Sequence, residues 1–128
     1  MKRAPAHQTA DAVEGDPRPV DIDTMRASAR RTLDVDAPRP RLEDLETLIR
    51  LLRGHIERLV PEIRDRLTEL PAGDVPARVA RIGVDEAWRR LHTTPGFGPD
   101  AAYRHAQRLA RSVQSCCDHY ENLRCSPR

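Results

Sequence analysis

The sequence predicts an all-α fold: a small four-helix up-down bundle with a disordered N-terminal tail and a kinked or broken third helix. The chain has 128 residues, enough for one domain with one modest core. Aromatic residues make up 3% of it, so the core must be built from Leu, Ile, Val and Ala, which favours helices over strands. Two long segments also space their aliphatic residues alternately by three and four positions, which is typical of a helix with one buried face.

The beginning of the chain predicts a disordered tail over residues 1–19, followed by a single bundle domain over residues 20–125. The tail contains three of the 11 prolines, mixed charges and almost no large apolar side chain. In the first helix, Asp21 is placed to cap the N-terminus, and Val20 and Met25 are placed to form a hydrophobic staple. Its apolar stripe consists of Ile22, Met25, Ala29 and Leu33.

The second helix is expected over about residues 42–70, and its apolar stripe marks one face packed against another helix. Gly54 and Pro61 both lie opposite this stripe. We therefore expect the helix to continue through Pro61 and to bend there. The stripe consists of Leu42, Leu45, Ile49, Leu52, Ile56, Leu59 and Ile63.

The third segment, residues 74–91, carries two apolar stripes that point in different directions. Gly83 lies where they meet, so we expect either two short helices or one helix kinked at Gly83, with Asp85 capping the second part. The first stripe is Val75, Val79 and Ile82, and the second is Ala80, Val84, Ala87, Trp88 and Leu91.

The last helix is expected over about residues 99–123, because Pro99 suits the first turn of a helix. Helices two and four are expected to supply most of the bundle's seam, and a homodimer would bury further apolar surface. The apolar stripe of the last helix is Ala102, Ala106, Leu109, Val113, Cys116, Tyr120 and Leu123.

Composition argues against several classes of function. The net charge is +2, too small and too evenly spread for a typical nucleic-acid binder. The beginning of the chain has no apolar run of the kind found in secretory signals, and no stretch approaches the ~18–20 apolar residues that span a bilayer. Three cysteines, two of them adjacent, favour a reducing compartment. We therefore expect a cytoplasmic protein with no membrane segment.

A cluster of reactive residue types near the end of the chain is the first candidate site. Cys116 and His119 share a helix face, as do Cys117 and Glu121. Zinc takes four ligands, so two more would have to come from another helix, with His55 as the best donor. The periodicity favours the alternative that Cys116 lies in the core and Cys117 at its edge, as small apolar side chains. A nucleophilic Cys117 lacks an orienting third group, so we expect no catalytic residue. Because the favoured interpretation places the cysteines in the core, we also expect no metal and no cofactor.

Two further side chains are candidates for ligand binding or interaction. His55 can act as a ligand or base, but the favoured interpretation is a hydrogen bond to a neighbouring helix, for instance to Glu121 or Tyr120. Trp88 is the only tryptophan and is expected to fill the gap between the third segment and the seam. An exposed Trp88 would instead be an interaction residue.

Arginines raise two other possibilities. The sequence around Gly83 resembles the turn of a helix-turn-helix DNA reader, but Arg89 and His92 stand where that motif buries apolar residues, so nucleic-acid binding is the third option. A row of arginines on the outer face of the last helix is either solvated surface or a contact for an acidic partner protein. This row is Arg104, Arg108 and Arg111.

Three motifs taken together carry a resemblance to a known family: RGHIERLVPEI (53–63), DVPARVARIGVDEAWRRL (74–91) and AQRLARSVQSCCDHYENL (106–123). They resemble an uncharacterised family of small actinobacterial proteins that are usually labelled natural-product biosynthesis proteins. The match covers about residues 40–124. The resemblance implies a setting in secondary metabolism or its regulation, and it supplies no catalytic residue.

The sequence therefore favours a non-catalytic accessory bundle that binds a partner protein. The alternative is a small ligand- or metal-binding bundle or a minor enzyme, with its site between helices two and four. The residues of that alternative are His55, Cys116, Cys117, His119 and Glu121.

Overall fold

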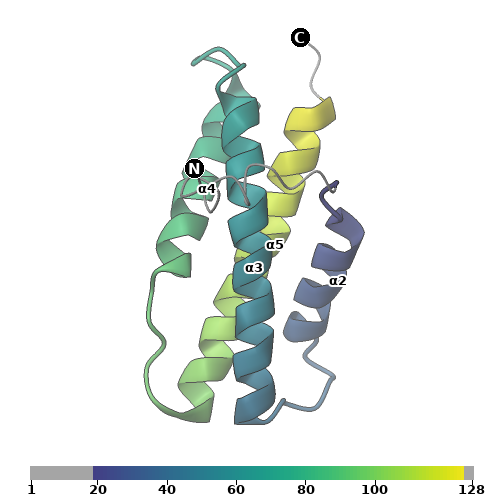
Figure 1. Cartoon of the computed structure of the whole chain (residues 1–128), viewed down its shortest axis with the longest axis vertical. Helices are drawn as coiled ribbons and strands as arrows, with labels where there is room; N and C mark the ends of the chain where they lie inside the picture. The colour runs from purple at the N-terminus through teal and green to yellow at the C-terminus, as the bar shows by residue number, and fades with distance from the viewer. Residues whose placement is uncertain (1–18, 126–128) are drawn as a thin grey trace, which may run out of the picture.

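The computed structural model describes residues 19–125 and confirms an all-α bundle (Figure 1). The expected tail, apart from its last residue, lies outside the described residues. The described helices are α2 (Ile22–Leu33), α3 (Leu42–Leu67), α4 (Val75–Leu91) and α5 (Gly98–Cys125).

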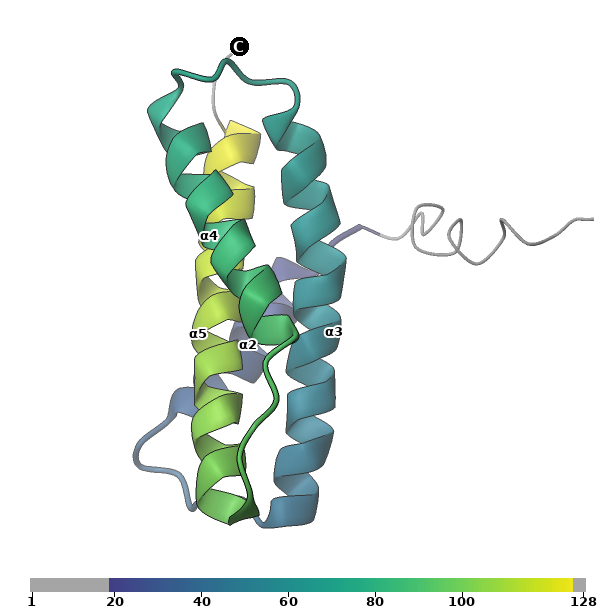
Figure 2. The ribbon, with the colours of Figure 1, turned by 90° about the vertical axis from the view of Figure 1, so that its left-hand side faces the viewer.

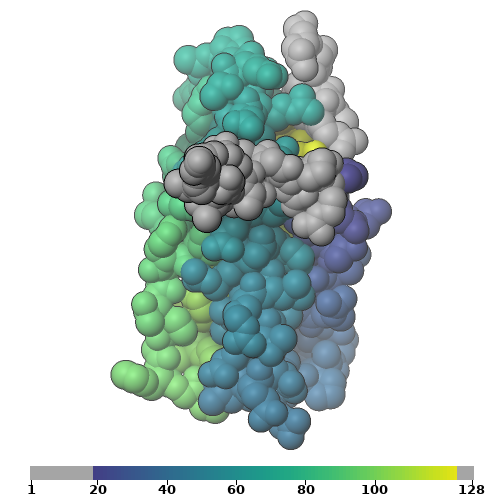
Figure 3. Space-filling view, in the orientation of Figure 1, coloured from purple at the N-terminus to yellow at the C-terminus, as the bar shows by residue number. Residues whose placement is uncertain are grey.

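Helices α3 and α5 each pack against all the other described helices, and α5 is the more central because its contacts with α2 and α4 are more extensive than those of α3. Its most extensive contact is with α3, which confirms that the two long helices form the main seam. Helices α2 and α4 lie on opposite sides of the α3–α5 pair (Figures 1 and 2). The space-filling view shows α3 between them on the facing surface (Figure 3).

Helix α2 begins as the sequence predicts. The Asp21 carboxylate accepts a hydrogen bond of 3.1 Å from the backbone N–H of Thr24, which satisfies one of the free donors at the helix N-terminus. Val20 packs against the core beside the buried Met25, so the predicted apolar pair is in place. Ala29, one turn further on, is fully buried.

Helix α3 confirms the predicted apolar stripe from Leu45 onward, whereas Leu42, its first predicted member, is 41% exposed at the start of the helix. The helix continues through Pro61, as expected for a proline opposite the seam. It ends at Leu67, three positions before the predicted end, because Pro71 disfavours a helical conformation at Leu70 and a turn forms instead. The fully buried residues of the stripe are Leu45, Leu52, Ile56, Leu59 and Ile63.

Helix α4 corrects two predictions. It is continuous through Gly83, so the prediction of two separate helices is wrong, while a kink stays a prediction. The cap is Asp74, whose carboxylate accepts a 2.9 Å hydrogen bond from the Ala77 N–H. Asp85, the predicted cap, lies inside the helix, 3.5 Å from Arg64.

The continuity of α4 follows from which of its two apolar stripes is buried. One stripe, with Val84 at its centre, faces the core and is covered by α3 and α5. The other, which begins at Val75, faces outward and stays exposed. A break at Gly83 is expected only if both stripes face the core. Since only one of them does, the helix can remain continuous. The buried face consists of Ala77, Ala80, Val84, Ala87 and Leu91.

The two adjacent cysteines of α5 are both fully buried. Cys116 lies in the core, as predicted. Cys117 lies deeper than the predicted core edge, because α2 covers that side of α5 and brings Arg26 close to it. Both are free cysteines.

Candidate functional site

The alternative site of cysteines and histidines is not assembled. His55 points toward α2, where its Nε2 lies 3.3 Å from the Ser28 hydroxyl, whereas His119 lies against Gly83 of α4. His55 therefore does bond to a neighbouring helix, but its partner is Ser28 rather than Glu121 or Tyr120. Within residues 19–125, no group of three or more His, Cys, Asp and Glu residues is placed to hold a metal ion.

The two thiols and Glu121 have structural roles in the bundle. Burial raises the pKa of Cys116 to about 12 and that of Cys117 to about 11, so both thiols stay protonated near neutral pH. The Glu121 carboxylate accepts a hydrogen bond of 2.8 Å from Arg26 of α2, and Asp118 accepts another of 2.6 Å. These bonds raise the pKa of Arg26 and tie α2 to α5. No local sequence pattern predicts this pairing, because the partners lie far apart in the chain.

Trp88 lies at the surface rather than in the gap that we predicted. It is 37% exposed, and its ring lies beside that of His92, with 4.9 Å between the ring centres. The Arg64 guanidinium lies over the Trp88 ring, 5.3 Å from its centre. Trp88 therefore helps to join α3 and α4 on the outside, and part of it remains open to contact.

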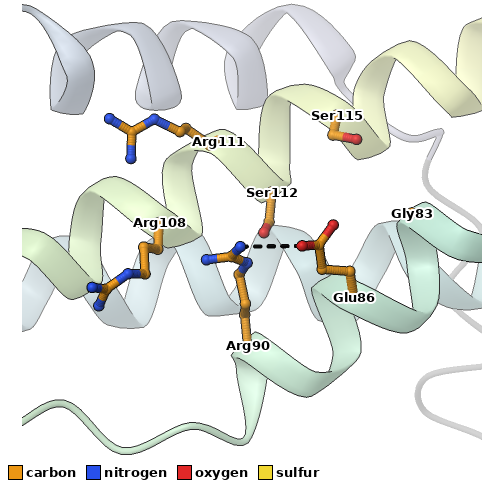
Figure 4. Close-up of a pocket in the computed structure, with 7 residues that line it drawn as sticks. All are labelled: Gly83, Glu86, Arg90, Arg108, Arg111, Ser112 and Ser115. Atoms are coloured by element: carbon orange, nitrogen blue, oxygen red, sulfur yellow. Dashed lines mark hydrogen bonds and ion pairs between the residues drawn. The ribbon is translucent and has the colours of Figure 1, made fainter.

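The most distinctive surface feature is a groove between α4 and α5. One part has a volume of about 390 Å³ (Figure 4), and the next has a volume of about 600 Å³. Arg111 and Ser115 line both parts, so the groove is continuous. The first part is lined by Gly83, Glu86, Arg90, Arg108, Arg111, Ser112 and Ser115. The second is lined by Val75, Pro76, Val79, Arg111, Gln114, Ser115, Asp118, His119 and Asn122.

Gly83 forms part of the groove floor and allows α4 to approach His119. A Cβ atom at this position would lie only 2.3 Å from the His119 Nε2, so no larger residue fits without moving the ring. The Ser115 hydroxyl lies 3.2 Å from the same nitrogen. Burial lowers the pKa of His119, which favours a neutral ring. The glycine that predicted a break is therefore a point of close contact.

The variant Gly83→Ala tests this contact. Alanine in a helix interior gains about 1 kcal/mol over glycine, but here it must displace His119 and lose a hydrogen bond worth about 0.5–1.5 kcal/mol. We expect no net gain in the free energy of unfolding, and a rise in the His119 pKa, measured by NMR titration, as the ring moves toward water.

The matched control is Gly54→Ala in α3, where an added Cβ meets nothing within 4 Å. This variant should gain about 0.5–1 kcal/mol. Equal stabilisation of the two variants would contradict the close contact at Gly83.

The charges around the groove leave a positive surplus. Glu86 pairs with Arg90 at 3.2 Å, and Asp118 is already held by Arg26. Arg108 and Arg111 are exposed, and neither forms an ion pair with another residue of the described part of the chain. Figure 4 shows Arg108 on the side of α5 that faces Arg90, and Arg111 on the opposite side of the α5 ribbon.

An exposed apolar stripe follows the α4 side of the groove. Val75, Val79 and Ile82 are 63%, 53% and 69% exposed, although they repeat at the spacing of a buried helix face. The sequence patterns indicated the apolar stripe and the row of arginines as two separate features. They did not show that Val75, Val79 and two of these arginines line one groove, with Ile82 continuing the exposed stripe along α4, because that depends on the side of α5 against which α4 packs.

A buried histidine lies elsewhere on α5. His105 is 3% exposed, and its Nε2 has no hydrogen-bond partner among residues 19–125. Burial, together with the nearby charges of Arg53 and Arg108, lowers its pKa. The folded protein thus takes up a proton here at lower pH than the unfolded chain does, so stability is lost as the pH falls below about 6.5.

The variant His105→Leu tests this effect through the pH dependence of unfolding. Leucine removes both the unpartnered nitrogen and the titration, so we expect a gain of about 1 kcal/mol at pH 7 and a larger gain at pH 5. Denaturant unfolding at several pH values measures it. Some acid sensitivity should remain, because His55 and His119 also have lowered pKa values. An unchanged pH slope in the variant would refute this role of His105.

The fold and the groove together define a small all-α bundle with one apolar and basic face left open. Residues 23–125 match the model of a family described as a family of unknown function (DUF6415), and the chain belongs to that family. The match includes all of α2 except its first residue, whereas the resemblance seen in the sequence began at about residue 40. No curated protein and no solved structure matches the chain. None of the described helices is both long and apolar enough to cross a bilayer.

Proposed function

We propose that this protein is a non-catalytic accessory bundle that binds a partner protein through the α4–α5 groove. The observation that carries the proposal is the uncovered stripe of Val75, Val79 and Ile82 beside the groove. Full burial of such a side chain contributes about 1.5–3 kcal/mol, so covering the stripe is a substantial driving force for association. The bundle itself provides nothing that covers these three residues among those described.

The structural contacts of the chemically versatile residues support a non-catalytic role. The thiols of Cys116 and Cys117 are buried and protonated, and Glu121 is tied to Arg26. The third option, DNA reading by a helix-turn-helix, loses its support because α4 is continuous where that motif turns.

The setting that we propose is secondary metabolism or its regulation in an actinobacterial cytoplasm. The resemblance of the three sequence motifs supports this setting, and two of them, 74–91 and 106–123, supply both walls of the groove. Deletion of the gene in the native host should alter the profile of secondary metabolites, measured by mass spectrometry of culture extracts. An unchanged profile would count against this setting but not against partner binding.

Affinity capture from the native host tests partner binding. The tagged full chain is compared with the double variant Val79→Ser/Ile82→Ser and with the control Leu51→Ser, which removes an exposed apolar residue of α3 instead. We expect the wild type and the control to retain the same partner, and the double variant to lose it. A partner retained equally by the double variant, or a monomer that retains none, would overturn the proposal.

A further inference from the structure

We infer that the occupant of the groove is an acidic amphipathic α-helix of the partner protein, lying lengthwise between α4 and α5. This inference rests on the proposed function and specifies the chemistry of the partner. It combines three properties of the same surface: its length and lining, its apolar edge and its unpaired positive charge.

The length and lining of the groove suit a helix. From Val75 to Arg90 the lining spans four turns of α4, or roughly 22 Å at 1.5 Å per residue. A partner helix of about 15 residues matches this length. The short side chains of Ser112 and Ser115 line the groove on α5 and leave room for another helix to approach.

The apolar edge has the spacing that a second helix needs. Val75, Val79 and Ile82 stand at positions i, i+4 and i+7, so their side chains form a single ridge along α4. A partner helix with its own apolar residues at the same spacing can place them beside this ridge, as in other complexes that hold a helix in a groove.

The charges of the groove select a partner with carboxylates. Glu86 and Asp118 already pair with arginines of the bundle, whereas Arg108 and Arg111 form no ion pair with any residue of the described region. Carboxylates on the flank of an incoming helix would pair with these two guanidinium groups without breaking an existing bond. A basic helix would meet uncompensated positive charge at the same place.

The same observations disfavour a second copy of this chain as the occupant. A two-fold dimer through the groove would place the same arginines of both chains at one interface, where they repel each other. A nucleic acid would satisfy the arginines but would leave the apolar ridge uncovered. The experiment below distinguishes a second copy and a nucleic acid from an acidic helix.

The probes are two stapled helical peptides of about 16 residues that share one leucine stripe and carry either Glu or Lys on its flanks. Their binding to the full-length chain is measured by fluorescence anisotropy. We expect the acidic peptide to bind at least about tenfold more tightly than the basic one, and this advantage to shrink at high salt, because the charges are exposed. Equal affinities, or no binding of the acidic peptide, would overturn the inference.

Charge variants locate the binding. The double variant Arg108→Ala/Arg111→Ala should lose about tenfold in affinity for the acidic peptide. The control Arg41→Ala/Arg50→Ala removes the same charge at exposed positions of α3 and its N-cap, and should bind as the wild type does. Equal losses in the two double variants would show a general charge effect and overturn the inference.

Two further measurements separate this inference from the proposed function. If the native partner is lost by Val79→Ser/Ile82→Ser but retained by Arg108→Ala/Arg111→Ala, partner binding stands and the acidic helix is wrong. Sedimentation of the purified chain and its mobility shift with duplex DNA complete the test. Self-association that depends on Ile82, or DNA binding that depends on Arg108, would replace the acidic helix with a second copy or a nucleic acid.

Discussion

The thiols of Cys116 and Cys117 will react with iodoacetamide far more slowly in the folded protein than in the unfolded chain. The thiolate is the reactive form, and burial raises the two pKa values from 9.0 to about 12 and about 11. At pH 8 the thiolate population therefore falls roughly a thousandfold for Cys116 and roughly a hundredfold for Cys117. Exclusion of the reagent from the core slows both reactions further, since neither side chain is exposed.

The measurement uses a Cys125→Ser background, so that these two thiols are the only ones present. Mass spectrometry follows alkylation in buffer and, as the control, in guanidinium chloride, where both sites should be labelled within minutes. Rapid labelling of either cysteine without denaturant would contradict its place in the core. It would also reopen the alternative of a reactive or metal-binding site around Cys116 and His119.

The sequence predicted the seam because a regular apolar spacing and a fully buried helix face have the same physical cause. Cys116 is the clearest example, since its place in the repeat indicated a core position despite its reactive thiol. The same reasoning failed at Gly83. A repeat shows that residues share a face, but it does not show whether another element covers that face, and the stripe from Val75 to Ile82 is left open.

The candidate site was harder to predict because it depends on the order of the helices around α5. His55 and His119 each lie on a flank of a long helix, but α2 receives one and α4 the other, so they face opposite sides of the seam. Arg108 was recognised as an outer residue. Its position beside Arg90 follows from the packing of α4 against α5, which no local pattern in the sequence reveals.

Replacement of Leu52 by alanine will lower the free energy of unfolding by about 2–5 kcal/mol, as is usual for a leucine removed from a packed core. Leu52 is fully buried in the seam between α3 and α5, whereas its neighbour Leu51 is 42% exposed. The control Leu51→Ala should therefore cost less than about 1 kcal/mol, although it removes the same atoms one position earlier.

Urea unfolding followed by circular dichroism gives the loss in the free energy of unfolding for both variants. The difference between the two losses shows which face of α3 points into the core. Successive residues of a helix point about 100° apart. If α3 were rotated about its axis relative to this structure, Leu51→Ala would therefore cost as much stability as Leu52→Ala or more. Such a result would also displace the groove, because α4 and α5 are positioned by the same buried face of α3. A large cost confined to Leu52 therefore supports the arrangement on which the open stripe and the arginines of the groove depend.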